Sequence, residues 1–345
     1  MNELTEKVKF AIVGAGVIAP FHAKAITNNP NAELVAIADV EPAKASKLAG
    51  EYGVGTVYAD YEEMLKNEEI DVISVCTPSG LHGEVAIAAA QAGKHIFCEK
   101  PLEITSAKMQ QMIDAAEQYN VKLGCVFQRR VMPSSLVVKK AVEEGKLGKL
   151  VLGDAYLKYY RSPEYYRSAG WRGTWALDGG GALMNQGVHG IDLIQWLMGD
   201  VESVFARSAA LVRDIEVEDT AVAVVKYKCG AFGVIQGTTS VYPGLETRFE
   251  LHGENGSIIF ADSGIKQWKF ANSDEAAPEA GAFVSSSSDP SKIADSGHYV
   301  LCEDLIQAIR EDREPLVSGK EAKKSVDLIL AIYESARTGK EVFLG

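Results

Sequence analysis

The sequence of 345 residues has few cysteines and no long apolar run. Its five cysteines are an odd number and form no Cys-x-x-Cys pair, which argues against a disulfide framework and against a zinc cluster. No segment approaches the roughly 18 apolar residues that span a bilayer, and residues 1–9 lack the apolar core of a secretion signal. These absences predict a protein of the reducing cytoplasm that binds neither a metal nor a membrane.

Positive charge is also scarce. The 35 Lys and Arg residues against 47 Asp and Glu give a formal net charge of -12. Proteins that bind nucleic acid neutralise phosphates with basic residues, so this balance argues against a nucleic-acid partner. The composition, 47% hydrophobic and 24% charged, is that of a soluble globular protein, and the length suits two domains. We expect the domains to be residues 1–128 and 129–345.

The first of these ranges alternates short apolar runs with segments of helical periodicity. Short buried strands that are separated by helices are typical of a parallel sheet covered on both faces. The pattern therefore predicts an α/β domain with a doubly wound parallel sheet. Its strands are expected at residues 9–13, 34–38, 56–58, 72–76, 95–98 and 123–127, with helices between them.

The second range has a different pattern, in which most of the β-rich runs follow one another and are joined by short turns. Such runs are typical of an antiparallel sheet, so we expect an α+β domain. Strands are expected at residues 150–160, 203–212, 220–227, 231–240, 247–252 and 257–260, and helices at 134–144, 182–198, 300–310 and 320–337. The polar stretch 272–295, with four serines at 285–288, is expected to be a surface loop.

A glycine-rich turn, Gly14-Ala15-Gly16-Val17-Ile18-Ala19, joins the first expected strand to the first helix. Glycines here permit a tight turn and let the backbone approach a pyrophosphate, which the helix N-terminus then binds. Asp39 ends the second strand, where its carboxylate can bind a ribose 2′-hydroxyl or, alternatively, cap the next helix. A carboxylate repels a 2′-phosphate, so the pattern predicts NAD, with NADP disfavoured. The expected contacts are Gly14, Gly16, Val17, Ile18 and Asp39.

Polar residues also follow the fourth and fifth expected strands, at the edge where open α/β sheets bind ligands. Glu99-Lys100-Pro101 places a lysine where the positive charge of an oxidised nicotinamide would disfavour its ammonium form and allow proton exchange. The alternative is a surface lysine at a strand end. His82 either contacts the cofactor or caps a helix. The cofactor contacts expected at this edge are Thr77, Pro78, Ser79, His82, Glu99, Lys100 and Gln128.

The apolar helix expected at 182–198 follows three glycines and carries a polar stripe. Asn185, His189, Asp192 and Trp196 have the spacing i, i+4, i+7 and i+11, which puts them on one helical face. His189 can accept and return a proton near neutral pH, and Asn185 can orient a hydroxyl. Asp192 could hold the imidazole or a substrate hydroxyl. The alternative for His189 is a histidine satisfied within the core; a metal site lacks further ligands.

Aromatic and cationic residues gather before the glycines, in Tyr165-Tyr166-Arg167 and in Trp171-Arg172-Gly173-Thr174-Trp175. They can form a wall for a sugar or a nucleotide, or simply a packed aromatic loop. His298 lies just before a helix, where it could reach a substrate. The residues that we expect to bind substrate are Asn185, Asp192, Arg167, Trp171, Arg172 and His298.

In the order and spacing of these motifs, the chain resembles the Gfo/Idh/MocA family of nicotinamide-dependent oxidoreductases over its whole length. The resemblance implies a Rossmann domain, a C-terminal domain with a large open sheet that mediates dimers or tetramers, and an active site at their interface. It also implies that Lys100 and His189 are catalytic and that the Lys100-Pro101 bond is cis. Residues 162–166, 170–175, 184–186 and 215–220 look like the branch of UDP-N-acetyl-glucosaminuronate 3-dehydrogenases.

One residue departs from the wider family, in which many members have aspartate where this chain has Asn185, so their carboxylate role cannot be carried over. The function expected is oxidation of a secondary hydroxyl of a sugar or nucleotide sugar with NAD. Alternatives are an NAD-assisted glycosidase or epimerase that recycles its cofactor, and a non-catalytic NAD-dependent sensor. The net charge does not exclude a UDP-sugar, since a diphosphate needs only a few local cations such as Arg167 or Arg172.

Overall fold

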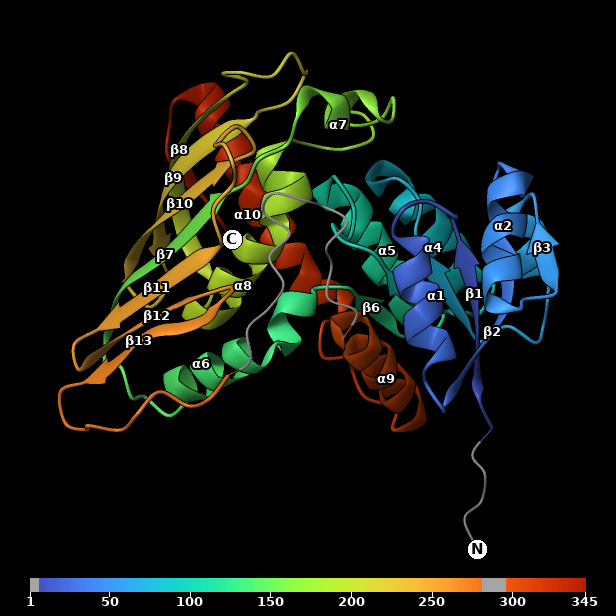
Figure 1. Ribbon diagram of the computed structural model, residues 1–345, viewed down its shortest axis with the longest axis horizontal. Helices are drawn as coiled ribbons and strands as arrows, with labels where there is room; N and C mark the ends of the chain where they lie inside the picture. Colours follow the sequence, from blue (N-terminus) through green and yellow to red (C-terminus); the bar gives the residue numbers. More distant parts are fainter. Residues whose placement is uncertain (1–5, 281–295) are drawn as a thin grey trace, which may run out of the picture. The chain divides into compact units, whose positions relative to one another are not determined.

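The computed structural model describes residues 6–280 and 296–345 (Figure 1). Contacts divide the chain into two compact units, Met1–Gln128 with Asp295–Lys323, and Arg129–Ala294 with Lys324–Gly345. The expected domains differ from these units in residues 295–323, which group with the first unit because helix α9 (Ser296–Arg310) packs against α1 (Ala19–Thr27). The serines at 285–288 and most of the expected polar loop lie outside the described residues.

The first unit contains a parallel sheet of six strands in the order β3-β2-β1-β4-β5-β6. All six expected strands are present and the expected doubly wound class is confirmed; the strands are β1 Val8–Val13, β2 Ala32–Ala38, β3 Thr56–Tyr58, β4 Val72–Val75, β5 His95–Cys98 and β6 Leu123–Cys125. The helices between them are α1, α2 Pro42–Tyr52, α3 Tyr61–Leu65, α4 His82–Gln91 and α5 Ser106–Gln118, with short 3-10 turns η1 Ser79–Leu81 and η2 Gln128–Val131.

The order of the strands reverses direction between β1 and β4, which is where open α/β sheets leave a crevice at their carboxyl edge. The central strands read as nearly continuous apolar runs because both faces are covered; Phe10, Ile12 and Ile73 are fully buried. Side chains fix two of the helix starts. Asp60 accepts a bond from the backbone N–H of Glu62, and Thr105 accepts one from Lys108.

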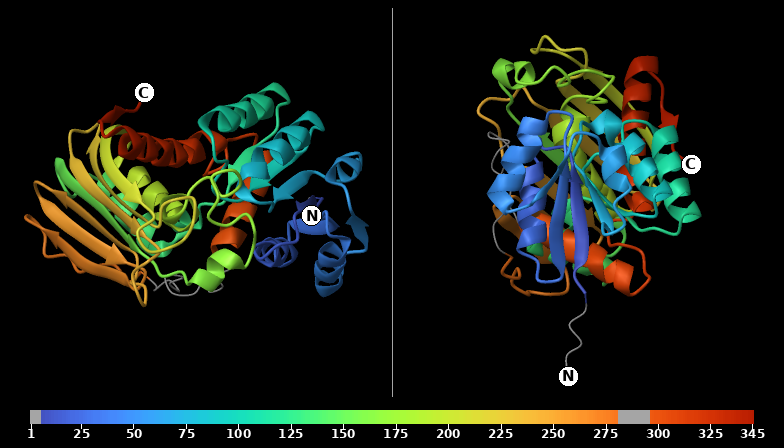
Figure 2. Two further views of the ribbon diagram at one scale, coloured as in Figure 1. Left: turned by 90° about the horizontal axis from the view of Figure 1, so that it is seen from above. Right: turned by 90° about the vertical axis from the view of Figure 1, so that its right-hand side faces the viewer.

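The second unit contains an eight-stranded sheet in the order β13-β12-β11-β7-β10-β9-β8-β14. Figure 2 shows the ribbon from two further directions. Strands β7 and β10 pair in parallel and the other neighbours are antiparallel, which confirms the expected mostly antiparallel class. The strands are β7 Leu150–Lys158, β8 Val201–Ala209, β9 Thr220–Tyr227, β10 Phe232–Thr238, β11 Arg248–Gly253, β12 Gly256–Ala261, β13 Gly264–Phe270 and β14 Val342–Phe343. The sequence did not predict β13 and β14.

The helix expected at 182–198 consists of two segments. Residues Ala182–Gly187 form a π-helix, η3, and Val188–Met198 continue as the α-helix α8. A π-helix closes its hydrogen bonds over five residues instead of four, so the α-helical spacing expected from Asn185 to His189 does not hold. The other helices of this unit are α6 Pro133–Glu143, the short α7 Pro163–Arg167 and α10 Gly319–Thr338, whose residues from Lys324 onward belong to it.

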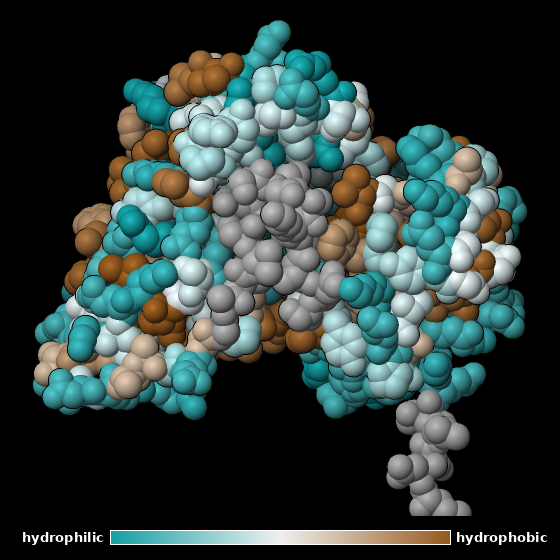
Figure 3. All heavy atoms as spheres, in the orientation of Figure 1, coloured by the Kyte–Doolittle hydropathy of each residue, from teal (hydrophilic) through white to brown (hydrophobic). Residues whose placement is uncertain are grey.

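The two faces of the large sheet differ. The π-helix η3 and helix α8 pack against β7, β9 and β10 on one face. On the other, which we call the outer face, apolar side chains alternate with polar ones and remain exposed, and Figure 3 shows apolar residues recurring along the strand-bearing side of this unit. The exposed apolar residues of the outer face are Leu152, Phe205, Val222, Val224 and Phe232. In the described part of the chain, no helix has the length and apolarity needed to cross a membrane.

Candidate active site and cofactor-binding edge

The two glycines of the loop after β1 differ in what surrounds them. Gly14 has a φ of +96°, and a Cβ there would lie 2.7 Å from the carbonyl carbon and oxygen of Cys76. A Cβ at Gly16 would meet nothing within 4 Å. Gly14 is therefore required by the close approach of the backbone that follows β4, whereas Gly16 faces open space that a phosphate can enter. Val17 is 71% exposed beside it, and Ile18 is the N-cap residue of α1.

The side chain of Asp39 accepts hydrogen bonds from the glycine loop and from the start of α2. Its Oδ2 accepts a hydrogen bond from the backbone N–H of Ala15 at 2.6 Å, and its Oδ1 accepts one from Glu41 at 2.7 Å. The N-cap residue of α2 is Glu41, whose own side chain makes no capping bond. The carboxylate of Asp39 therefore faces the loop, and its remaining lone pairs can still accept bonds from a ribose hydroxyl.

His82 links the loops that follow β4 and β5. Its Nδ1 lies 2.8 Å from the carbonyl oxygen of Pro101, and its Nε2 lies 2.9 Å from that of Thr77. Burial lowers the pKa of His82, and a neutral ring donates to one of these oxygens at a time. His82 is 1% exposed, so it supports the two loops and has no ring nitrogen that points to open space.

Two buried polar atoms at this edge have no hydrogen-bond partner among the described residues. They are the hydroxyl Oγ1 of Thr77 and the side-chain Oε1 of Gln128. Buried polar atoms are nearly always satisfied, so unpaired ones at a sheet edge are good positions for ligand contacts. Between them in the chain, Pro78 and Ser79 open the turn η1. The loop, Asp39 and these two atoms together fit a dinucleotide.

The segment Glu99-Lys100-Pro101 follows β5, and its Lys100-Pro101 peptide bond is cis, as the resemblance implied. Lys100 is half-buried. The Oε1 of Glu99 lies 2.8 Å from Nε2 of His22 and 3.1 Å from Nε2 of His298. Glu99 and His298 are 4% and 1% exposed, and their side chains contact each other. From the sequence we had expected Glu99 to contact the cofactor and His298 to contact the substrate.

His22, Glu99 and His298 are also the group of described residues whose ligand atoms could surround a metal, since these atoms lie within 4.8 Å of one another. Their N···O separations of 2.8 and 3.1 Å are also those of hydrogen bonds from the histidines to the carboxylate. Burial alone would raise the pKa of Glu99, but the bonds from the two histidines outweigh it and hold this pKa well below the ordinary value.

In the second unit, Asn185 lies in η3 and is held by Asp178. Its Nδ2 donates to Oδ1 of Asp178 at 2.6 Å, and the other oxygen of Asp178 accepts the backbone N–H of Gly173 at 2.8 Å. Gln186 donates to Oδ1 of Asn185 at 3.2 Å and to the hydroxyl of Tyr165 at 2.9 Å. These bonds fix the orientation of the Asn185 amide.

Several of the aromatic and cationic residues that precede the glycines contact one another around Tyr165. The guanidinium of Arg172 lies 4.2 Å from the ring centre of Tyr165 and 4.7 Å from that of Trp171, and it donates to the Tyr165 hydroxyl. Arg161 lies 5.6 Å from the same tyrosine ring. We call Arg161, Tyr165, Trp171 and Arg172 the arginine–tyrosine cluster. Arg167 is exposed and pairs with Glu164 at 2.7 Å, so it is not part of this cluster.

His189 and Asp192 both lie on α8 but in different surroundings. His189 is half-buried in the first turn of the helix. Asp192 is 1% exposed, and Arg130 donates a hydrogen bond to each of its oxygens. The Nε of Arg130 lies 2.8 Å from Oδ2, and its Nη2 lies 2.7 Å from Oδ1. Asp192 is therefore one half of a buried ion pair, where the sequence led us to expect a substrate contact. The Arg130 guanidinium also lies 5.7 Å from the ring centre of Trp196.

The sequence did not indicate the residue that holds the start of η3, which is Glu218. Its carboxylate accepts the backbone N–H groups of Gly181 and Leu183, each at 2.9 Å, and its carbonyl accepts that of Ala182 at 3.0 Å. A Cβ at Gly181 would lie 1.8 Å from this carbonyl, so a glycine is required there. Tyr333 also donates to the carboxylate, at 2.8 Å. One buried acid thus anchors the π-helix that carries Asn185.

The anchor makes stability depend on pH. Burial raises the pKa of Glu218 from 4.5 to about 7, although the bonds from Leu183, Tyr333 and Gly181 oppose it. Because the folded pKa is the higher one, the contribution is fully present below pH 4.5 and is lost as the pH rises through 7. A shift of this size corresponds to roughly 3 kcal/mol. Urea unfolding at pH 5 and pH 8 measures the free energy of unfolding, and we expect Glu218→Gln to lose this part of its pH dependence. If the free energy changed between the two pH values as much in Glu218→Gln as in the wild type, the prediction would be wrong.

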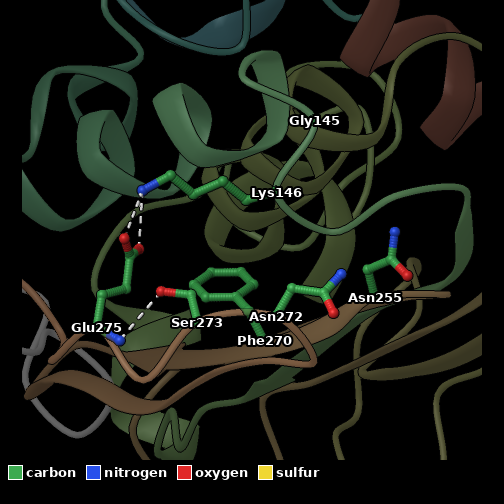
Figure 4. A pocket seen from close by; sticks show the side chains of 7 residues that line it. All are labelled: Gly145, Lys146, Asn255, Phe270, Asn272, Ser273 and Glu275. Carbon is green, nitrogen blue, oxygen red and sulfur yellow. Dashed lines mark hydrogen bonds and ion pairs between the residues drawn. The ribbon is translucent and has the colours of Figure 1, made fainter.

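A hollow elsewhere in the second unit has a volume of about 270 Å³ (Figure 4). None of the expected site residues lines it. Its two charged side chains, Lys146 and Glu275, pair with each other, the Nζ lying 2.8 and 3.1 Å from the carboxylate oxygens. The other residues that line it are Gly145, Asn255, Phe270, Asn272 and Ser273. It is separate from the residues that the candidate site requires.

Comparison with known proteins agrees with this geometry. Residues 8–127 match the oxidoreductase family with an NAD-binding Rossmann fold, GFO_IDH_MocA, and residues 136–259 match the GFO/IDH/MocA C-terminal domain. Myo-inositol 2-dehydrogenase of Thermotoga maritima is 29% identical over 98% of both chains. D-glucoside 3-dehydrogenase of Escherichia coli is 29% identical over 98% of this chain and 97% of its own.

Among solved structures, the chain is similar to the WlbA dehydrogenase of Bordetella pertussis in complex with NADH and UDP-GlcNAcA. The identity is 36%, 99% of both chains is covered, and the TM-score is 0.88. Levoglucosan dehydrogenase in complex with NADH has the same TM-score at 25% identity. With matches in both units and relatives of full length, the chain belongs to the Gfo/Idh/MocA family of oxidoreductases, and its first unit is an NAD-binding Rossmann domain.

Proposed function

We propose that the protein is an NAD-dependent dehydrogenase that oxidises a secondary hydroxyl of a nucleotide sugar, with C3 of a UDP-sugar as the reacting position. The observation that carries this proposal is the 36% identity, over nearly the whole chain, to a dehydrogenase whose structure contains NADH and UDP-GlcNAcA. The inositol and glucoside dehydrogenases are less similar, at 29%. They support the coarser assignment of a sugar dehydrogenase.

The residues at the edge of the parallel sheet fit the cofactor. The open space at Gly16 suits the pyrophosphate, Asp39 suits the ribose, and the unpaired Oγ1 of Thr77 offers a further contact. When bound, NAD accepts two electrons from the carbon that carries the hydroxyl. The protein itself must bind the sugar, remove the hydroxyl proton and stabilise the charge that develops on the oxygen.

We assign these tasks to three residues. His189 accepts the hydroxyl proton on a ring nitrogen and returns it in the reverse reaction. The Nζ of Lys100 stabilises the developing alkoxide. Asn185 orients a sugar hydroxyl, because its bonds to Asp178 and Gln186 hold the amide in one orientation. Asp192 has no part in this assignment, since both of its oxygens bind Arg130.

The arginine–tyrosine cluster supports the proposal that the substrate is negatively charged. Guanidinium groups bind phosphate and carboxylate through paired hydrogen bonds, and the flat rings of Tyr165 and Trp171 can stack on a sugar or a base. The buried Nε of Arg172 has no partner among the described residues, so this guanidinium keeps a donor for a ligand. Arg172 takes the phosphate-binding role in this proposal, in place of the exposed Arg167.

Turnover assays test the function. The protein is incubated with NAD or NADP and with UDP-GlcNAcA, UDP-GlcNAc, myo-inositol or simple glucosides, and the absorbance of reduced nicotinamide is followed. A stoichiometric rise with NAD and a UDP-sugar is expected. Sugar release or epimerisation without a net rise would indicate a cofactor-recycling enzyme instead. No turnover with any sugar, together with a bound partner protein, would indicate a sensor.

We also propose that two copies of the chain associate through the outer face of the large sheet. Phe205 and Val224 are register partners on β8 and β9, and they are 41% and 53% exposed. Apolar side chains that recur on one sheet face are typical of an interface. Light scattering after gel filtration should show a dimer or tetramer for the wild type and a smaller assembly for Val224→Glu. Tyr119→Glu, at an exposed site of the first unit, is the control; an unchanged mass of Val224→Glu would contradict the proposal.

A further inference from the structure

Beyond these roles, we propose that Glu99, held by His22 and His298, is a positioning residue that fixes Lys100 for catalysis. The inference rests on the proposed function, because it concerns the placement of Lys100 in that reaction. From the sequence we expected Glu99 to contact the cofactor and His298 to contact the substrate, whereas His22 was not among the expected site residues. The structure brings the three side chains together in the interior of the first unit.

The carboxylate of Glu99 receives bonds from three parts of the unit. His22 lies on α1 and His298 lies on α9, and both direct Nε2 at Oε1. The backbone N–H of Lys100 donates to Oε2 at 3.1 Å. The hydroxyl of Ser74, on β4, lies 2.6 Å from Nδ1 of His22. The network thus joins two helices and one strand to the peptide that precedes the side chain of Lys100.

The protons of this network can be assigned consistently. If His22 is neutral and donates through Nε2, its Nδ1 accepts the hydroxyl proton of Ser74. Burial lowers the pKa of His22, which favours this neutral form. His298 likewise donates through Nε2, and its Nδ1 has no hydrogen-bond partner among the described residues. Glu99 stays a carboxylate that accepts three N–H groups, so it needs no proton of its own.

The backbone on the other side of Lys100 is held as well. The carbonyl oxygen of Pro101 accepts from Nδ1 of His82 at 2.8 Å. Lys100 therefore lies between two anchored peptide groups, one fixed by Glu99 and one by His82. Catalysis by a charged group is sensitive to its position, and a displacement of about 1 Å can lower a rate about 100-fold. Loss of the carboxylate would release the N–H of Lys100 and move its side chain.

Substitutions at two positions test the proposal. Glu99→Gln puts an amide opposite two histidine donors, and His298→Phe keeps a ring while removing the N–H. We expect each to lower kcat roughly 10- to 100-fold, while KM and the affinity for NAD change less than about threefold. His298→Gln places an N–H near the position of Nε2 and should restore most of kcat. Normal kcat in Glu99→Gln and His298→Phe, or equal loss in both His298 variants, would overturn the proposal.

A second measurement does not depend on turnover. The rate at which an amine-reactive reagent modifies Lys100 is followed by mass spectrometry in folded protein, with the exposed Lys47 as the internal control. We expect Glu99→Gln and His298→Phe to change the rate at Lys100 and leave that at Lys47 as it is; an unchanged rate at Lys100 would overturn the proposal. A wild type that is inactive on every sugar would instead refute the proposed function, and the labelling would still decide the role of Glu99.

Discussion

Replacing Lys100 with methionine is expected to lower kcat about 1,000-fold, with little change in the affinity for NAD. Methionine keeps the length and apolar volume of the side chain but removes the charge that stabilises the developing alkoxide, and such interactions are commonly worth a factor of about 100 to 1,000. His189→Asn removes the proton acceptor and is expected to cost about 100- to 10,000-fold. Steady-state kinetics with the best UDP-sugar and NAD measure both effects.

Each variant has a matched control in the same unit. Lys47→Met removes an exposed lysine from α2, and His252→Asn removes a histidine on β11 that bonds Ser257 at 2.8 Å. Both controls should keep near-normal turnover. If Lys100→Met or His189→Asn kept it too, that residue would be removed from the proposed mechanism.

The first unit could be predicted well from the sequence, because each strand and the glycine loop are marked by residues that are neighbours in the chain. Each strand is a short apolar run with an abrupt end, and the six observed strands begin and end within two residues of the expected ranges. The glycine loop is equally local, since the positive φ of Gly14 and the close carbonyl of Cys76 require a residue without a side chain. The strand β13 was missed because Gly264–Phe270 contains charged residues on its exposed positions and no long apolar run.

The partners of the site residues could not be predicted, because they come from distant parts of the chain. Arg130 and Asp192 are 62 residues apart, and His298 reaches Glu99 across 199 residues. A polar residue on an apolar helix has the same pattern whether it faces a substrate or a buried ion partner. Only the tertiary structure separates the half-buried His189 from the fully paired Asp192.

The π-helix was not predicted either. Nothing in residues 182–198 departs from an α-helical pattern, yet residues Ala182–Gly187 take the wider turn. At its start, Glu218 accepts the three consecutive backbone N–H groups from Gly181 to Leu183, a contact between segments that are far apart in the chain. The three glycines before the helix were visible in the sequence, but the acid that requires the last of them is 37 residues away.

Replacing Asp192 with alanine is expected to destabilise the fold by about 3–5 kcal/mol, because it leaves the charge of Arg130 buried without its partner. The two side chains are 0% and 4% exposed and make two hydrogen bonds below 3 Å. Urea unfolding followed by circular dichroism measures the loss. If Asp192 were instead a substrate contact, the variant would raise KM strongly and unfold at nearly the wild-type urea concentration.

The double variant Arg130→Met with Asp192→Leu distinguishes the loss of an ion partner from the loss of a substrate contact. Removing both charges together leaves no unpaired ion, and apolar replacements of similar volume are often neutral or stabilising for such a pair. We therefore expect the double variant to recover most of the stability that Asp192→Ala loses and to keep its KM near the wild-type value. A double variant that is stable but has lost its affinity for the sugar would return Asp192 or Arg130 to the substrate site.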